Sequence, residues 1–272
     1  MSSLAALSYQ VPCPMISGGE TITTTLLQPP YKVADKPIMA STYLLLMEER
    51  RPLFTYSLII ILILIQLYLS ILPGDEALRL YEAYSLIPAM LLRGLHLEAV
   101  VAYMFLHGGW LHLALNSVAL LGAGGIVERE LGALRCAAIY LSSGMVSGLV
   151  HVLLYPSSDV PLVGASGAIF GLIAVLFLLM PFKITYILFI PLPAFLVGVI
   201  LSIAEFSALW LGVEGVVAHD VHVAGLIYGS ICAFLIDSKR ALRGLLVAVA
   251  TIILLYLLAL RLGLLTLLPH GF

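Results

Sequence analysis

The chain has 272 residues with a formal net charge of −2, is 62% hydrophobic, and has a mean hydropathy of +1.12. Ordinary soluble domains contain roughly 45–50% apolar residues, so this composition excludes one and indicates a polytopic membrane protein. A charge near zero gives no reason to expect a nucleic-acid partner. The three cysteines, Cys13, Cys136 and Cys232, have neither a Cys-x-x-Cys spacing nor the pattern of a disulfide framework.

Residues 1–50 differ from the rest of the chain in composition. They contain several prolines and the polar run Thr21-Ile-Thr-Thr-Thr25. They lack the basic start, apolar run and cleavage site of a signal peptide. We interpret them as a cytosolic N-terminal extension that is partly disordered.

Apolar segments bounded by charges, prolines or glycines follow this extension. They are Leu53–Leu72, Trp110–Val127, Leu134–Tyr155, Ser166–Met180, a segment from Pro191 to Trp210, Ala218–Ile236 and Leu245–Leu268. Between the first two segments, Asp75–Glu98 is amphipathic, which predicts a membrane-surface loop with short helices. The pattern therefore predicts an all-α membrane protein.

Lysine and arginine residues near the span ends predict the orientation in the membrane. If the N-terminus is cytosolic, most of the flanking basic residues fall on the inner side. The loops after the third and fifth spans contain no lysine or arginine. We therefore expect a cytosolic N-terminus and an extracytoplasmic C-terminus.

The span beginning at Ser166 is the shortest, and Gly164-Ala-Ser166-Gly167 stands at its start. About fifteen residues at ~1.5 Å each reach only ~22 Å, against a hydrocarbon core of ~30 Å, so this helix must begin below the membrane surface. A serine among small residues suits a nucleophile that neighbouring backbone approaches closely. The alternative role for these glycines is helix packing through Gly167-xxx-Gly171.

Ionisable and amide side chains also occur in the spans, where each charged group costs at least ~2–3 kcal/mol. His112 and Asn116, four residues apart, share one face of the second span, and His107 lies just before it. His222 lies about one turn into the sixth span. His112, Asn116 and His222 fall with Ser166 at a similar depth in the outer leaflet, which indicates a nucleophile, a base and further hydrogen-bond donors.

Two other interpretations of the histidines stay open. Each histidine could be satisfied by hydrogen bonds between helices. Alternatively, His107, His112, His219 and His222 could bind zinc. However, the spacing of His219-Asp220-Val221-His222 differs from the His-Glu-x-x-His of zinc metalloproteases, so we expect no metal.

Together these residues resemble the rhomboid family of intramembrane serine proteases. The matching pieces are Phe105-Leu-His107-Gly-Gly-Trp-Leu-His112-Leu-Ala-Leu-Asn116, Gly125-x-x-Glu128-x-x-x-Gly132, Gly164-Ala-Ser166-Gly167 and Ala218-His-x-x-His222-x-x-Gly225-x-x-x-Gly229. They cover the second to sixth spans, about half of the chain. One departure lies in the first loop, where many rhomboids have a Trp-Arg pair and this chain reads Leu97-Glu98-Ala99.

The resemblance implies a rhomboid-like six-helix bundle over residues 51–238, with one extra C-terminal transmembrane helix in residues 239–272. It implies Ser166 as nucleophile and His222 as general base, a dyad without an acid. Asp220, two residues before His222, is the one carboxylate that we consider as a possible partner of His222. The other implied roles are an oxyanion hole of His112, Asn116 and the Ser166 backbone N–H, an aromatic stack by Phe170, and supporting positions at His107, Gly164, Gly167, Gly225 and Gly229.

The implied activity is that of a serine endopeptidase that cleaves peptide bonds in or near transmembrane helices. The expected partners are a transmembrane-helix protein substrate and membrane lipid, and no cofactor is expected. The expected location is the cell membrane, with the active site open to the extracytoplasmic side and the substrate entering beside the fifth span. The alternative function is that of a non-catalytic pseudoprotease that binds membrane helices.

Overall fold

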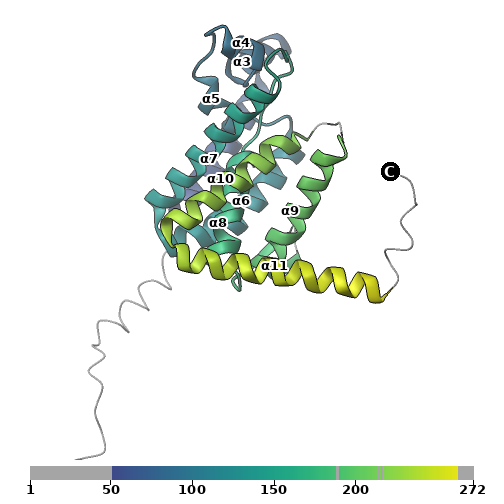
Figure 1. Cartoon of the computed structure of the whole chain (residues 1–272). Coiled ribbons are helices and arrows are strands. Elements are labelled where there is room, and N and C mark those ends of the chain that lie inside the picture. The colour runs from purple at the N-terminus through teal and green to yellow at the C-terminus, as the bar shows by residue number, and fades with distance from the viewer. Residues whose placement is uncertain (1–50, 188–189, 214, 216, 263–272) are drawn as a thin grey trace, which may run out of the picture. The chain divides into compact units, whose positions relative to one another are not determined.

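The computed structural model describes residues 51–187, 190–213, 215 and 217–262, so the predicted cytosolic extension lies outside the described residues. The described part is mostly helical (Figure 1). Its elements in chain order are α2 (Leu53–Ile71), α3 (Gly74–Tyr84), α4 (Pro88–Leu92), α5 (Ala99–Ala102), the 3₁₀ helix η1 (Tyr103–Phe105), α6 (Trp110–Leu131), α7 (Ala133–Leu154), α8 (Ser166–Leu179), β1 (Ile184–Ile187), β2 (Ile190–Pro193), α9 (Ala194–Trp210), α10 (His219–Ile236) and α11 (Ser238–Arg261).

Helices α2, α6, α7, α10 and α11 are each long and apolar enough to cross a membrane, and α8 and α9 are shorter apolar helices. The predicted spans therefore appear as helices close to their expected positions. The chain is an all-α, multi-pass membrane protein.

Helix α8 is the central element of the bundle, because α6, α7, α9, α10 and α11 all pack against it. All of its residues from Gly167 to Leu179 are buried. A helix that is apolar on every side is the kind that other helices surround. Its 14 residues extend ~21 Å, less than the ~30 Å of a hydrocarbon core.

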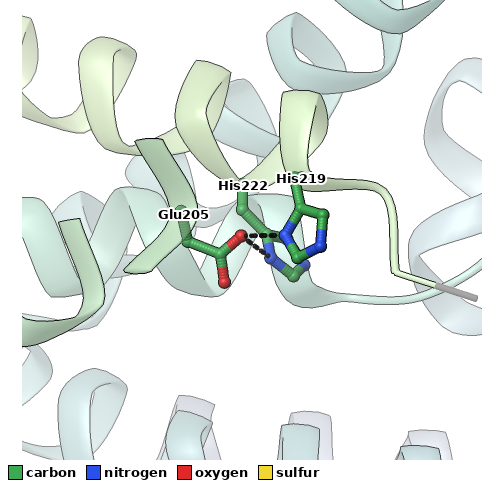
Figure 2. Close-up of side chains that lie close together, drawn as sticks. All are labelled: Glu205, His219 and His222. Atoms are coloured by element: carbon green, nitrogen blue, oxygen red, sulfur yellow. Dashed lines mark hydrogen bonds and ion pairs between the residues drawn. The ribbon is translucent and has the colours of Figure 1, made fainter. Parts of the chain in front are cut away.

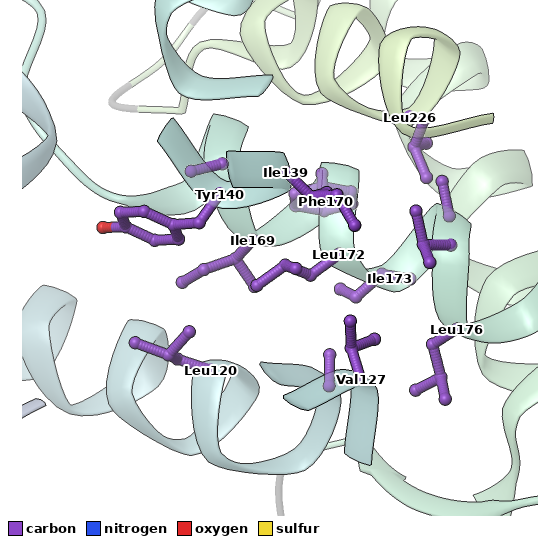
Figure 3. Close-up of a cluster of buried hydrophobic side chains, with 14 of the residues drawn as sticks. Leu120, Val127, Ile139, Tyr140, Ile169, Phe170, Leu172, Ile173, Leu176 and Leu226 are labelled. Atoms are coloured by element: carbon purple, nitrogen blue, oxygen red, sulfur yellow. The ribbon is translucent and has the colours of Figure 1, made fainter. Parts of the chain in front are cut away.

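The hydrophobic core lies where α6, α7, α8 and α10 meet (Figure 3). Leu120 and Val127 of α6 and Leu172 of α8 have no exposed surface. Ile139 of α7 and Leu226 of α10 complete the contact around α8. The neighbours of α8 each bury one face, whereas α8 buries its whole circumference.

Glu128 of α6 caps the start of α2. Its carboxylate accepts three hydrogen bonds, each of 2.8 Å, from the Phe54 N–H, the Thr55 N–H and the Thr55 hydroxyl. The first N–H groups of a helix have no partner within it and carry partial positive charge, so a buried carboxylate there is well compensated. Helix α6 continues past the expected Val127 and ends before Gly132, which has φ +89° and donates its N–H to the Glu128 carbonyl.

The segment before α9 differs from the prediction. The residues from Pro191 were expected to begin the fifth span, but β2 pairs antiparallel with β1 and the helix begins only at Ala194. Pro191 and Pro193 lie on a strand of a two-stranded sheet, where the missing proline N–H is tolerated. Lys183, just before this hairpin, forms a 2.7 Å ion pair with Glu130 of α6.

Helix α11 begins at Ser238, before the expected Leu245, because the Asp237 carboxylate accepts a hydrogen bond from Arg240 N and caps the helix. Its buried residues are Ala241, Gly244 and Ala248, all in its first half. Gly244 lies against the backbone of Leu178. Figure 1 shows α11 crossing the end of the bundle, so a seventh transmembrane crossing stays a prediction.

The segment between α2 and α6 holds the loop that leads into α8. Leu86 and Leu162 exchange two backbone hydrogen bonds of 3.0 Å. The buried Tyr103 accepts a 3.0 Å hydrogen bond from the Gly164 N–H and donates one of 2.6 Å to the Gly144 carbonyl. The predicted surface loop thus contains short helices, and it positions the backbone just before Ser166.

Candidate active site

Gly164 lets the chain turn sharply into α8. Its φ is +126°, which residues with a side chain rarely adopt. A Cβ there would lie 2.9 Å from His112 Nε2 and 3.9 Å from Ser166 Oγ. The His112 and Ser166 side chains therefore both lie close to the space beside the Gly164 Cα, and only glycine leaves that space empty.

Ser166 is the first residue of α8 and is partly exposed, whereas Ala165 and Gly167 on either side are buried. The N–H groups of the first helical turn have no partner within the helix. They form the positive end of the helix dipole and favour negative charge nearby. The serine hydroxyl thus stands where an oxyanion would be stabilised.

His112 of α6 presents one ring nitrogen toward this point. Its Nδ1 accepts a 3.3 Å hydrogen bond from the Gly108 N–H. In a neutral ring the proton then sits on Nε2, the nitrogen that faces Gly164. Asn116, one turn on, is buried and uses one amide hydrogen to donate a 3.0 Å bond to the His112 carbonyl.

His107 supports His112 from behind. Its side chain is fully buried, and its ring meets the His112 ring edge-on at 5.1 Å between centroids. Burial, and next the charge that His112 can carry, lower the pKa of His107 to about 4. His107 is therefore neutral at physiological pH and contributes packing rather than charge.

His222 of α10 is held by Phe170 of α8. The two rings stack at 4.3 Å between centroids with an interplanar angle of 17°. Phe170 follows Ser166 by about one helical turn, so the two share a face of α8. No hydrogen bond joins Ser166 Oγ to His222 in the part of the chain that the structure describes.

The two glycine pairs on α8 and α10 bring these helices into backbone contact. Gly225 lies against the Gly167 carbonyl, and Gly229 lies against the backbone of Gly171. This is the close approach that the small-xxx-small spacing predicts. It places the first turns of α8 and α10 side by side.

A carboxylate lies near His222, although the resemblance implies a dyad without an acid, and it is not Asp220. Asp220 instead pairs with His151 of α7 at 2.7 Å. Glu205 of α9 places Oε2 2.6 Å from His219 Nδ1 and 3.1 Å from His222 Nδ1 (Figure 2). The interpretation that only Asp220 could approach the base is therefore wrong.

Glu205 could have been found from the sequence, because it is the one charged residue in the apolar helix α9. Such a residue is a candidate functional group for the same reason that His112 and His222 are. What the sequence lacks is the partner. The packing of α9 against α10 decides which histidine a carboxylate on α9 can reach.

Among the described residues, Glu205, His219 and His222 form a group that could hold a metal ion, since their ligand atoms lie within 4.8 Å of one another. His107 and His112, the other members of the zinc alternative, are not in this cluster. Zinc bonds of ~2.0–2.2 Å in a tetrahedral site separate neighbouring ligand atoms by roughly 3.3 Å. The 2.6 Å between Glu205 and His219 is instead a hydrogen-bond distance.

Comparisons with known proteins show which family the chain resembles. The Rhomboid domain matches residues 95–240. The chain is 37% identical over 148 residues to Rhomboid-like protease 5 of Toxoplasma gondii, covering 53% of this chain and 17% of that protein. It is 33% identical over 129 residues to Rhomboid protease GluP of Bacillus subtilis, covering 47% of this chain and 25% of that protein.

A plant relative, RHOMBOID-like protein 5 of Arabidopsis thaliana, is 40% identical over 74 residues, covering 27% of this chain and 24% of that protein. The chain thus matches a quarter or less of the length of each of these relatives. The matched region contains every element from α5 to α10 and all of the residues of the candidate active site. Because the domain match covers more than half of the 272 residues, this chain belongs to the rhomboid family.

Proposed function

We propose that this protein is an intramembrane serine endopeptidase in which Ser166 is the nucleophile and His222 the general base. The observation that carries the proposal is the stack of Phe170 on His222, one helical turn from Ser166, across the glycine contact of α8 and α10. The names of the relatives from Toxoplasma gondii and Bacillus subtilis, both called proteases, support the same class of activity.

In the proposed reaction His222 removes the proton from the Ser166 hydroxyl as the oxygen attacks the scissile carbonyl. Because His222 Nδ1 faces Glu205, Nε2 is the nitrogen that takes this proton. The imidazolium then protonates the leaving amine, and an acyl-enzyme remains on Ser166. The neutral His222 next activates a water molecule that hydrolyses the ester.

The tetrahedral intermediates of both steps carry a negative oxygen. The proposed donors to it are the Ser166 backbone N–H at the start of α8, the His112 Nε2–H and the free amide hydrogen of Asn116. Preorganised donors of this kind are each worth roughly 3–4 kcal/mol of transition-state stabilisation in other enzymes. The tautomer of His112, set by the Gly108 N–H, supports its assignment as a donor.

The proposed substrate is a transmembrane helix of another membrane protein. A helical peptide bond is shielded by its own hydrogen bonds, so the substrate must unwind at the cleavage site, which favours small or helix-breaking residues there. We propose the cell membrane as the location, with the N-terminus cytosolic and the C-terminus extracytoplasmic. Water then reaches Ser166 from the extracytoplasmic side, and the substrate enters beside α9.

The test uses the full chain in proteoliposomes with a transmembrane reporter substrate. Ser166→Ala and His222→Ala should abolish cleavage, while the matched control Ser142→Ala should cleave at the wild-type rate. Ser142 bonds only to backbone carbonyls of its own helix α7. Reporter binding that is unchanged by Ser166→Ala, with no cleavage by either protein, would favour the non-catalytic pseudoprotease instead.

A further inference from the structure

Glu205 stands apart from the rest of α9. The buried residues of α9 all lie in its first part and are Ala194, Val197, Gly198 and Val199. Gly198 packs against Phe177 of α8. Beyond them, an apolar groove of about 530 Å³ lies between α9 and α10, lined by residues such as Ser202, Phe206 and Ile227. From the second half of α9, Glu205 contacts His219 and His222 of α10.

The carboxylate of Glu205 is only 12% exposed and lies among apolar helices. An ionised carboxylate in such surroundings needs hydrogen-bond donors, or the burial is costly. His219 Nδ1 forms a hydrogen bond of 2.6 Å with one carboxylate oxygen. His222 Nδ1 lies 3.1 Å from the same oxygen, at an ion-pair distance but without the alignment of a hydrogen bond. A carboxylate only accepts, so each Nδ1 that bonds to it must carry a proton.

This assignment determines the chemistry of His222. A carboxylate oxygen 3.1 Å from Nδ1 favours the tautomer with the proton on Nδ1, which leaves the lone pair on Nε2 to take a proton from Ser166. A carboxylate at Nδ1 also stabilises the imidazolium that forms during the reaction, as the acid does in serine protease triads. Phe170 stacks on the face of the His222 ring and so restricts its rotation.

We propose that Glu205 is a positioning residue that completes a Ser166–His222–Glu205 triad, with the acid supplied by α9. The inference rests on the proposed function and deepens it. Because α9 contributes the acid, its position relative to α10 determines whether the base is fully oriented. A displacement of α9 that admits a substrate helix would separate Glu205 from His222, and the return of α9 would restore the triad.

Other titratable groups surround His222 and must be considered in any test that uses pH. They are Glu205 on α9, His219 and Asp220 on α10, His112 on α6 and, through its pair with Asp220, His151 on α7. Asp220 is already paired with His151 at 2.7 Å. Glu205 is therefore the carboxylate whose loss should change the pH profile of catalysis.

The experiment compares the wild type with Glu205→Gln in proteoliposomes. It measures kcat, KM and the pH profile of kcat/KM for a transmembrane reporter, and the rate at which a fluorophosphonate probe labels Ser166. Replacing the acid of a serine protease triad by its amide lowers kcat by about 10⁴-fold, so kcat and the labelling rate should fall by up to that factor while KM changes little. The acidic limb of the pH profile should also change, because the variant removes the negative charge 3.1 Å from His222 Nδ1.

Two further variants keep the test decisive. Glu205→Asp retains the carboxylate and should restore part of the pH profile, which a purely structural role would not predict. The matched control is Glu130→Gln, which removes a carboxylate of α6 that pairs with Lys183. Its kinetics should equal those of the wild type. Melting temperatures of all variants identify a folding defect.

Wild-type kcat and pH profile in Glu205→Gln would overturn the inference and leave the proposed protease intact. So would a rise in KM alone, since Glu205 would then only place α9 for substrate. Activity that responds to EDTA or added zinc in the wild type but not in Glu205→Gln would overturn it in favour of a metal site. A wild type that neither cleaves the reporter nor labels at Ser166 would overturn both proposals.

Discussion

The contact between α8 and α10 gives the sharpest prediction from the structure. We expect Gly225→Ala to impair catalysis more than folding. The added methyl group would press on the Gly167 carbonyl, with its Cβ 3.1 Å from the carbonyl carbon and 3.2 Å from Phe170 Cβ. Backbone atoms cannot rotate away as a side chain can, so the two helices must separate.

The expected cost can be estimated from two opposing effects. Inserting a methyl group into a well-packed contact costs about 1–3 kcal/mol, whereas replacing glycine by alanine within a helix regains up to ~1 kcal/mol. The net loss of stability is therefore modest. A misplacement of about 1 Å between reacting groups can lower the rate by ~10²-fold, so turnover should fall by about 10–100-fold.

The assay measures initial cleavage rates in proteoliposomes together with thermal melting. Gly125→Ala is the matched control, because a Cβ at this glycine of α6 meets Arg129 and Pro52 at 3.6 Å and 3.7 Å, which are ordinary contacts. The control should keep wild-type turnover. Full activity and an unchanged melting temperature in Gly225→Ala would refute the reasoning, because the helices would then tolerate a methyl group between them.

Three other predictions concern stability and are checked by thermal melting. Glu128→Ala should cost roughly 3 kcal/mol or more, because the Thr55 amide and hydroxyl lose a charged acceptor; Glu128→Gln should cost less, and equal melting of all three proteins would contradict the capping role. The pKa of His107 is lowered to about 4, so the neutral ring stabilises the fold fully above pH ~6.5. This stabilisation, up to about 3 kcal/mol, is lost as pH falls toward 4. His107→Asn should abolish that part of the acid sensitivity, and an identical pH dependence in the variant would refute it. His151→Leu should destabilise by about 3–5 kcal/mol through the unpaired Asp220 carboxylate, whereas adding Asp220→Leu should recover most of the loss; additive losses would show that the pair is not coupled.

Much of the architecture followed from the sequence alone. The lengths of the apolar segments predicted the helices of the bundle, because backbone groups in lipid must be satisfied within each segment. The small-residue spacing on Gly167 and Gly225 predicted a close helix contact, and the structure has that contact. Local chemistry and periodicity were sufficient for these features.

The partners of the buried charges required the tertiary structure. Asp220 and Glu205 lie on different helices, and the sequence does not state which histidine each one reaches. Helix rotation and the path of the connecting loops decide it, so Asp220 meets His151 while Glu205 meets His219 and His222. The late start of α9 was likewise decided by pairing of β2 with β1, a contact between segments that local periodicity does not encode.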